Sequence, residues 1–461
     1  MTAAADSIPT ADPIFQPLHF RNLTVKNRIF RSSISGRFDH YDGSGSRARI
    51  HWESRFADGG AGAIITSFVP VHASGAILPN YARIDADDKI PFWRTVAREL
   101  HERDCRLIIQ LSHSGRQRDV RSIEHPEASP SSTANAEPLN GLPSRAMTQA
   151  EIAEVVQWFA KAAGRAQKAG ADGVELHGAN GYLFTQFLSS SVNDRQDGYG
   201  GPLEQRARFA REVIRAIRAE VGRDFHVQFK ISATEYADAL FPWVSKGNTV
   251  DDSIEVLKWL VEDGIDAVHV STGASFPHPR NPSGQFPVDE FANTYEVMLR
   301  SGTHAPALFY VFTHWPLNRL FRWWWERGRG PDNPEGANLP DAIRIKAAIP
   351  VPIITTGGFQ TASVVRAAIA NNQTDAVSIA RPLIANPDLP KIWRSGKDRA
   401  DRPCTYCNKC LGNVLMNPLG CYDESRFPSR EAMVKEILSV YQPREFTEAE
   451  IEELGVDEAI T

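Results

Sequence analysis

The feature that most constrains the fold of this chain is a regular alternation of short apolar runs with longer segments of helical periodicity. Eight such runs occur, most of them too uniformly apolar to face water, and they predict buried strands. Gly or Asp often precedes a run, as expected where a helix ends and a strand begins. Such a series predicts a parallel (β/α)8 TIM barrel, although a doubly wound open sheet would show the same alternation. The expected strands are 28–33, 63–67, 107–111, 173–177, 227–231, 267–271, 353–356 and 376–380.

The segments between the expected strands carry helix signals of their own. Thr148 and Glu151 form a capping-box pattern, which opens a helix with Ile152, Val155 and Phe159 on one face. Similar apolar faces recur in the next two segments. We therefore expect an outer layer of amphipathic helices around the sheet.

Two segments exceed what a minimal barrel needs. About 80 residues separate the sixth and seventh expected strands, and we define the extended insertion as 272–345. Its aromatic residues between 308 and 325 suit a substrate lid or an interface, but a satellite core packed on the barrel is the favoured interpretation. The second segment is a short cysteine-containing tail. We expect a barrel domain over 1–400, and a tail with two short helices, 431–441 and 447–454, over 401–461.

Charge and hydropathy exclude several classes of protein. The chain has 51 Lys and Arg against 56 Asp and Glu, a net charge of −5, which argues against a dedicated nucleic-acid binder. No apolar run reaches about 18 residues, so no transmembrane segment is expected. Residues 1–13 lack the cationic flank and the apolar run of a secretory signal, and we therefore expect a cytoplasmic protein.

The strongest chemical signal follows the fourth expected strand. The run E-L-H-G-A-N-G-Y-L places His177, Asn180 and Tyr182 at the carboxyl end of that strand, where barrel enzymes hold their catalytic groups. His177 and Asn180 are suited to donate hydrogen bonds to one substrate oxygen. Tyr182 is a weak acid suited to deliver a proton nearby. Taken alone, the three residues would be explained more simply as ordinary loop polarity.

The residues that follow extend these three into a longer motif, which favours a functional role over ordinary loop polarity. The pattern H-x-A-N-G-Y-L…Q-F-L…N-x-R-x-D-x-Y-G-G…R-x-R-F over 177–209 closely resembles the old yellow enzyme family of flavin-dependent NADH:flavin oxidoreductases. The resemblance extends from Pro17 to Leu389. It includes N-L…K-N-R at 22–28 and A-R-P-L-I-A-N-P-D at 380–388. The resemblance implies a TIM barrel that holds FMN at its C-terminal mouth.

The resemblance also implies roles for the three residues after the fourth strand. His177 and Asn180 match the pair that binds the carbonyl or nitro oxygen of a small-molecule substrate and so polarises an adjacent C=C bond. Tyr182 matches the residue that protonates the α-carbon after hydride has moved from the flavin to the β-carbon. NAD(P)H would first reduce FMN and leave. The implied reaction is a ping-pong reduction of activated alkenes such as enones and nitroalkenes.

Three further residues match family contacts to the flavin ring. Gln110 matches the residue at the pyrimidine edge, and Ser35 is a looser counterpart of the hydroxyl near the flavin O4. Lys230 stands where the family usually has Arg. Lysine keeps the positive charge but loses the planar fork of the guanidinium group, so the flavin potential and geometry are expected to differ.

The end of the barrel sequence resembles the family's phosphate site. Gly357 and Gly358 follow the seventh expected strand, and Arg381 follows the eighth. Backbone N–H groups without a nearby Cβ and a bidentate arginine suit a phosphate group. The family usually has Gly before this arginine, where this chain has Ala380, and the extra methyl group is expected either to be tolerated or to shift the phosphate slightly.

Four of the five cysteines lie close together in the tail. Their spacing, Cys404-x2-Cys407-x2-Cys410-x10-Cys421, suits a [4Fe–4S] cluster or a tetrahedral zinc ion, with unliganded thiols as the other interpretation. The context is similar to the 2,4-dienoyl-CoA reductase and trimethylamine dehydrogenase branch, where a [4Fe–4S] cluster lies near FMN. Those relatives continue into nucleotide-binding domains. Here 40 residues follow Cys421 and no G-x-G-x-x-G occurs, so we expect the centre either to exchange electrons with a separate redox partner protein or to be structural.

Two other functions stay open on the sequence alone. One is an oxidative amine or N-methyl dehydrogenase that passes electrons from FMN to a partner through the cysteine-bound cluster. The other is a flavin electron carrier without an organic substrate. His177, Asn180 and Tyr182 favour the reductase, whereas the cysteines favour the two alternatives.

Overall fold

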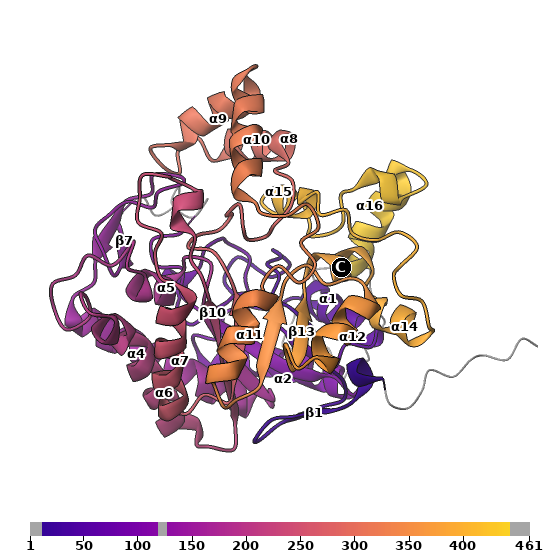
Figure 1. Ribbon diagram of the computed structural model, residues 1–461, viewed down its shortest axis with the longest axis horizontal. Coiled ribbons are helices and arrows are strands. Elements are labelled where there is room, and N and C mark those ends of the chain that lie inside the picture. The colour runs from indigo at the N-terminus through magenta and orange to yellow at the C-terminus, as the bar shows by residue number, and fades with distance from the viewer. Residues whose placement is uncertain (1–11, 119–126, 443–461) are drawn as a thin grey trace, which may run out of the picture.

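Eight parallel strands of the computed structural model, which describes residues 12–118 and 127–442, close into a barrel (Figure 1). The last strand pairs in parallel with the first, so the sheet has no open edge at this seam. The TIM barrel predicted from the sequence is therefore confirmed, and the doubly wound sheet is wrong. The barrel strands, in order, are β3 (Ile29–Arg31), β4 (Ala63–Ile65), β6 (Arg106–Ser112), β9 (Gly173–Gly178), β10 (His226–Ser232), β11 (Ala267–Ser271), β12 (Ile353–Thr356) and β13 (Ala376–Ile379).

Amphipathic helices surround the barrel and bury their apolar faces against it. The predicted capping box opens α4 (Gln149–Lys168): the Thr148 hydroxyl accepts from the backbone N–H of Glu151 at 3.2 Å, and the Glu151 carboxylate accepts from the backbone N–H of Thr148 at 2.8 Å. Two short strands, β7 (Ser129–Ser131) and β8 (Ser144–Ala146), pair in the loop before α4. The outer helices are α1 (Arg47–Asp58), α2 (Ile90–His101), α4 (Gln149–Lys168), α6 (Leu203–Val221), α7 (Val250–Asp263), α11 (Leu339–Ala348) and α12 (Ala362–Ala370).

The barrel interior changes from apolar to polar along its axis. At the amino ends of the strands, Phe30 and Ile108 pack with Phe20, which lies between β1 (Leu18–His19) and β2 (Thr24–Val25). Nearer the carboxyl ends, four polar side chains fill the interior and are fully buried. The pocket described below therefore has a polar floor. Its side chains are Gln110, Glu175, Gln228 and His269.

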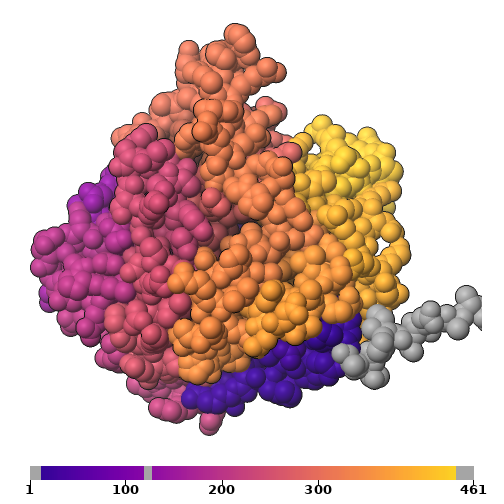
Figure 2. Space-filling model, viewed as in Figure 1, coloured from indigo at the N-terminus to yellow at the C-terminus, as the bar shows by residue number. Residues whose placement is uncertain are grey.

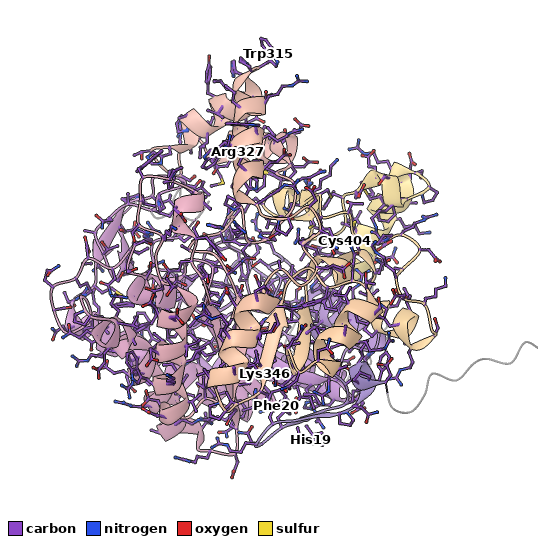
Figure 3. The ribbon with its side chains drawn as sticks, in the orientation of Figure 1. His19, Phe20, Trp315, Arg327, Lys346 and Cys404 are labelled. Carbon is purple, nitrogen blue, oxygen red and sulfur yellow. The ribbon has the colours of Figure 1, made fainter. Side chains whose placement is uncertain are left out.

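The insertion between β11 and β12 folds into a satellite unit at one end of the molecule. Its helices are α8 (Val288–Val297), α9 (Ala305–Thr313) and α10 (Leu317–Gly328). Phe286, Phe312 and Trp325 belong to an apolar cluster separate from the barrel core, which confirms the satellite core expected from the sequence. We call residues 305–328 the helical hairpin. The hairpin projects outward as a knob (Figure 2), with Trp315 at its tip and Arg327 nearer the barrel (Figure 3).

The tail packs against both the satellite unit and the barrel helices. After the short helices α13 (Arg381–Ala385) and α14 (Leu389–Arg394), α15 (Lys409–Asn413) lies against α8. Helix α16 (Arg430–Leu438) leads to residues that contact α1, where His51 Nδ1 lies 2.9 Å from the Val440 carbonyl oxygen. The first expected tail helix is confirmed, and the second, 447–454, lies outside the described residues. Within 12–118 and 127–442, no helix has the length and apolar character to cross a membrane.

Candidate active site

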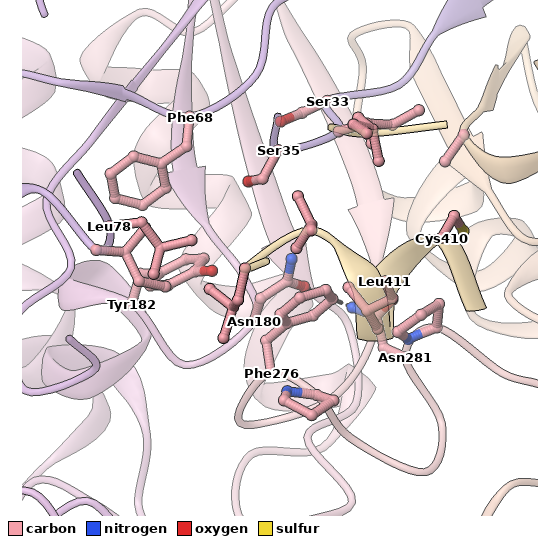
Figure 4. Close-up of a pocket in the computed structure, with 18 of the residues that line it drawn as sticks. Ser33, Ser35, Phe68, Leu78, Asn180, Tyr182, Phe276, Asn281, Cys410 and Leu411 are labelled. Carbon is pink, nitrogen blue, oxygen red and sulfur yellow. Dashed lines mark hydrogen bonds between the residues drawn. The ribbon is translucent and has the colours of Figure 1, made fainter. Parts of the chain in front are cut away.

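A pocket lies at the carboxyl ends of the barrel strands, and barrel, insertion and tail all contribute to its wall (Figure 4). Cys410 of the tail also lines it. Gly357 and Gly358 are not among its lining residues, although Thr356 just before them is. The structure thus brings most of the predicted site residues together. Those that line the pocket are Ser35, Gln110, His177, Asn180, Tyr182, Lys230 and Arg381.

His177 and Tyr182 form one end of the pocket, next to Phe68. The rings of His177 and Tyr182 meet edge to face with centroids 4.8 Å apart, and Phe68 packs on Tyr182 at 5.0 Å. Burial and the charge of Lys230 hold the pKa of His177 well below its usual value, so its imidazole is neutral at pH 7. Its Nδ1 is buried without a hydrogen-bond partner in the described part of the chain. This ring nitrogen is therefore available to a ligand.

Asn180 is held by a residue of the insertion. Asn281 Nδ2 donates to Asn180 Oδ1 at 2.5 Å and to the Thr272 carbonyl oxygen at 2.9 Å (Figure 4). Because Oδ1 already accepts a bond, the amide Nδ2 of Asn180 is left as a donor. At Gly181, with φ +83°, a Cβ atom would lie 2.5 Å from the Ala274 carbonyl oxygen, so the close approach of the insertion requires glycine there.

A buried carboxylate occupies the polar floor below these residues. Glu175 accepts hydrogen bonds from Gln110 Nε2 at 2.7 Å and Gln228 Nε2 at 2.5 Å, and lies 2.8 Å from His269 Nδ1. Burial alone would raise the pKa of Glu175. The ion pair with His269, the nearby charge of Lys230 and the hydrogen bond from Gln110 outweigh burial and lower this pKa to about 2. The floor therefore carries a fixed negative charge.

Lys230 brings a buried cation to the pocket wall. Its ammonium group makes no hydrogen bond or ion pair with any residue in the described ranges. Burial lowers the pKa of Lys230, and the charge of Glu175 opposes this effect. A buried cation without a partner is costly unless a ligand supplies acceptor oxygens or negative charge. Lys230 and the open Nδ1 of His177 therefore fit FMN, whose ring carries carbonyl oxygens and whose phosphate is anionic.

The residues of the expected phosphate site contact the tail. Arg381 Nη1 donates to the Ser283 carbonyl oxygen at 2.6 Å and to Asn408 Oδ1 at 2.5 Å. The Arg381 guanidinium lies 5.3 Å from the ring centre of Tyr406, whose hydroxyl donates to the Gly358 carbonyl oxygen at 2.5 Å. Tyr406 thus links Arg381 to Gly358. A phosphate group bound by Gly357, Gly358 and Arg381 stays a prediction.

The cysteines of the tail surround one small cavity beside the main pocket. Arg426 Nη1 donates to the Cys421 sulfur at 3.0 Å. Cys410 and Arg381 line both cavities, so the two are neighbours. Among the residues that the structure describes, however, no three His, Cys, Asp or Glu side chains form a group that could hold a metal ion. The metal site predicted from the sequence is therefore not confirmed. The lining cysteines are Cys404, Cys407, Cys410 and Cys421.

Sequence reasoning did not identify the outer part of the pocket. Its residues come from the insertion and the tail and are mostly apolar. The dense aromatic run of the insertion marked this segment as unusual, but it gave no sign of which side chains face the pocket. These residues are Phe276, Pro277, Asn281, Phe291, Tyr295, Met298, Leu411, Val414 and Leu415.

Comparison with known proteins points to one family. Residues 13–299 match the NADH:flavin oxidoreductase / NADH oxidase family. The NADH oxidase of Thermoanaerobacter brockii is 30% identical over 415 residues, which cover 88% of this chain and 54% of that protein. The cinnamate reductase of Clostridium sporogenes is 27% identical over 444 residues, 93% of this chain and 61% of that protein. The chain thus spans a little over half the length of these relatives.

Solved structures show the same fold. A 2-naphthoyl-CoA reductase in complex with 2-naphthoyl-CoA superimposes with a TM-score of 0.73 at 24% sequence identity. The match covers 89% of this chain and 56% of that one. At this identity the likeness shows the barrel architecture, and it assigns no substrate.

Proposed function

Because the chain belongs to the NADH:flavin oxidoreductase / NADH oxidase family, we propose that it is an FMN-dependent NAD(P)H oxidoreductase that reduces the C=C bond of activated alkenes. The observation that carries this proposal is the placement of two hydrogen-bond donors and a weak acid, His177, Asn180 and Tyr182, in one pocket wall. FMN, when bound, supplies a hydride carrier. The likeness to a cinnamate reductase supports an unsaturated carbonyl compound as the acceptor class.

His177 and Asn180 bind the substrate oxygen in this proposal. The neutral imidazole of His177 and the Nδ2 group of Asn180 withdraw electron density from the substrate through that oxygen. Asn281 holds Asn180 in place through the 2.5 Å hydrogen bond, which lowers the cost of ordering the donor. Tyr182 holds the proton that the α-carbon receives. Its ring packs between His177 and Phe68, and this packing keeps water away.

The remaining predicted residues hold FMN in the proposal. Lys230 supplies the positive charge, and the second Nε2 hydrogen of Gln110 is left for the flavin after its bond to Glu175. Ser35 lines the same wall. Gly357, Gly358 and Arg381 are assigned to the phosphate group.

Half-reaction kinetics of Tyr182→Phe test the reductase proposal. FMN reduced without oxygen should be reoxidised rapidly by 2-cyclohexenone in the wild-type protein. Loss of a general acid slows such a step by about 10²- to 10⁴-fold. Tyr182→Phe should therefore slow reoxidation by this factor and leave reduction by NAD(P)H within a few-fold.

Tyr81→Phe is the matched control, because Tyr81 lines the same pocket without belonging to the proposed machinery. It should leave both half-reactions within a few-fold. The proposal is wrong if no enone or nitroalkene accelerates reoxidation. Equal slowing of both half-reactions by Tyr182→Phe would remove the role assigned to Tyr182.

A second function is favoured by the shared wall of the two cavities. Because Cys410 and Arg381 line both, electrons from FMN would have a short route to a centre held by the cysteines. This arrangement supports an amine or N-methyl dehydrogenase that passes electrons to a partner protein. A zinc ion needs four sulfurs roughly 3.8 Å apart, from Zn–S bonds of about 2.3 Å, whereas a [4Fe–4S] cluster needs a wider set. The four cysteines share one cavity, but no three of the described side chains form a group that could hold a metal ion, so their placement favours neither centre.

Metal analysis of anaerobically purified protein separates these alternatives. A [4Fe–4S] cluster predicts about four iron and four sulfide per chain. Cys410→Ser should lower both, whereas Cys105→Ser, at a buried cysteine outside the cluster, should lower neither. Zinc without labile sulfide, or no metal at all, would contradict the cluster.

A further inference from the structure

The helical hairpin exposes an unusual number of large apolar side chains. Tyr310, Trp315, Leu320 and Trp323 expose 54%, 76%, 56% and 57% of their surface. Trp243 exposes 82%, and its loop neighbours Leu240 and Phe241 pack in the satellite core that supports the hairpin. In the described part of the chain, Trp243, Trp315 and Trp323 are the three tryptophans among the exposed large hydrophobic residues. Scattered exposed apolar residues are normal, but such a concentration marks an interaction site.

These side chains are not required for the satellite core. Helix α10 has two distinct faces: Phe321 and Trp325 pack on Phe286 in the core, with ring centroids 4.9 and 4.6 Å away. Leu320 and Trp323 lie on the opposite, exposed face. The outer face of the hairpin is therefore free to bind a partner while the inner face holds the fold.

The charge of the hairpin is opposite to that of the chain. Residues 305–328 contain three arginines and one glutamate, a net charge of +2, whereas the chain carries −5. Neither Arg319 nor Arg322 forms a side-chain hydrogen bond or ion pair with a residue in 12–118 or 127–442, and both are exposed. Arg327 lies over the Trp323 ring at 4.6 Å. Exposed arginines beside aromatic rings suit an anionic, partly apolar partner.

The order of these groups along the hairpin matches a lipid interface. Trp315 lies at the outermost tip and Arg327 nearer the barrel (Figure 3), and α9 contains no Asp, Glu, Lys or Arg. In a bilayer surface, tryptophan and leucine enter the boundary of the acyl chains while arginine stays at the phosphates. The hairpin is also a narrow convex knob (Figure 2), whereas a stable protein interface needs about 800 Å² on each partner.

We propose that the helical hairpin is a membrane-surface anchor that binds bilayers containing anionic phospholipids. The tip around Trp315 and Leu320 enters the headgroup region, and Arg319, Arg322 and Arg327 pair with lipid phosphates. The hairpin lies in one leaflet and does not cross the bilayer, in agreement with the absence of a membrane-spanning helix from the described residues. This inference does not depend on the reaction that the pocket performs.

Vesicle co-sedimentation of the full, flavin-loaded chain tests the charge requirement. The wild-type protein should sediment with vesicles of equal parts phosphatidylcholine and phosphatidylglycerol, and much less with phosphatidylcholine alone. Each arginine near an anionic surface strengthens binding roughly fivefold, so Arg319→Glu/Arg322→Glu should weaken binding by at least about twentyfold. The matched control Arg223→Glu/Lys391→Glu makes the same charge change on exposed residues outside the hairpin. It should weaken binding far less.

Tryptophan fluorescence tests the insertion of the tip. Brominated lipids should quench wild-type fluorescence, and Trp315→Ser should reduce both the quenching and, by roughly tenfold, the binding. Tyr41→Ser, at an exposed aromatic residue elsewhere, should change neither. Equal binding by the hairpin and control variants would overturn the proposal. So would lipid-independent dimerisation that Trp315→Ser abolishes, because the hairpin would then bind a second copy of the chain.

Discussion

The two halves of the pocket are built in different ways. The inner half stands on barrel strands: Gln110 on β6 and Gln228 on β10 pair in register with Glu175 on β9, and Lys230 on β10 pairs in register with His177 on β9. The outer half comes from the insertion and the tail and is mostly apolar, with Phe276 and Met298 among its residues. A rigid polar half suits catalysis, which needs hydrogen-bond donors at fixed positions. An apolar half on helices and loops suits substrate selection, because it decides which substrate fits the pocket.

The largest expected effect of a substitution lies in the polar floor. Glu175→Ala removes the acceptor of two buried amide groups and leaves a cavity. Breaking such a buried charged network costs about 3–5 kcal/mol, so the free energy of unfolding should fall by this amount. Chemical denaturation of the FMN-free protein measures the change.

Glu255→Ala is the control for this substitution. The Glu255 side chain is half exposed on α7 and pairs with Lys258. Glu255→Ala should therefore change the free energy of unfolding by no more than about 0.5 kcal/mol. If Glu175→Ala were as mild as the control, the inner half would not be held by its floor. Where Glu175→Ala gives no folded protein, Glu175→Gln offers the smaller perturbation.

The pH dependence of stability gives a second test of the inner half. Glu235 follows β10 beside a small cavity that Ser232 also lines, and Ser232 Oγ accepts from the backbone N–H of Asn180 at 3.3 Å. Burial raises the pKa of Glu235 to about 7. The folded state therefore binds a proton more tightly than the unfolded state. The resulting stability, about 3 kcal/mol, is present below pH 4.5 and is lost as the pH rises through 7.

Unfolding free energies at pH 5 and pH 8 measure this contribution. Relative to Glu235→Gln, whose side chain does not titrate, the wild-type protein should lose stability between these values. Identical pH profiles for both proteins would show that Glu235 titrates normally in the fold.

A smaller effect is expected for the cation of the inner half. Lys230→Met should weaken FMN binding about 10- to 100-fold, because a hydrogen bond to a charged group contributes about 1.5–3 kcal/mol. Lys230→Arg should retain most of the affinity. Quenching of FMN fluorescence measures the dissociation constant, with the exposed Lys258→Met as the control. Unchanged affinity in Lys230→Met would place the flavin away from Lys230.

The sequence predicted the inner half far better than the outer half. His177, Asn180 and Tyr182 lie within six residues at the carboxyl end of one strand, so local strand signals and the barrel rule place them together. Asn281 binds Asn180 across a separation of 101 residues, and no periodic pattern encodes a loop contact of that length. The link from Tyr406 to Gly358 likewise depends on how the tail folds back. The insertion and the tail are placed by tertiary contacts, which local sequence propensities do not determine.

The most direct test of the division of roles is single-turnover reoxidation of reduced FMN by saturating 2-cyclohexenone in Asn180→Ala and Met298→Ala. Asn180→Ala should slow the saturating rate by about 10²- to 10³-fold, as expected for loss of an oxyanion donor, with reduction by NAD(P)H little changed. Met298→Ala should shift the concentration needed for saturation and leave the saturating rate within a few-fold. An equal loss of the saturating rate in both variants would contradict the account.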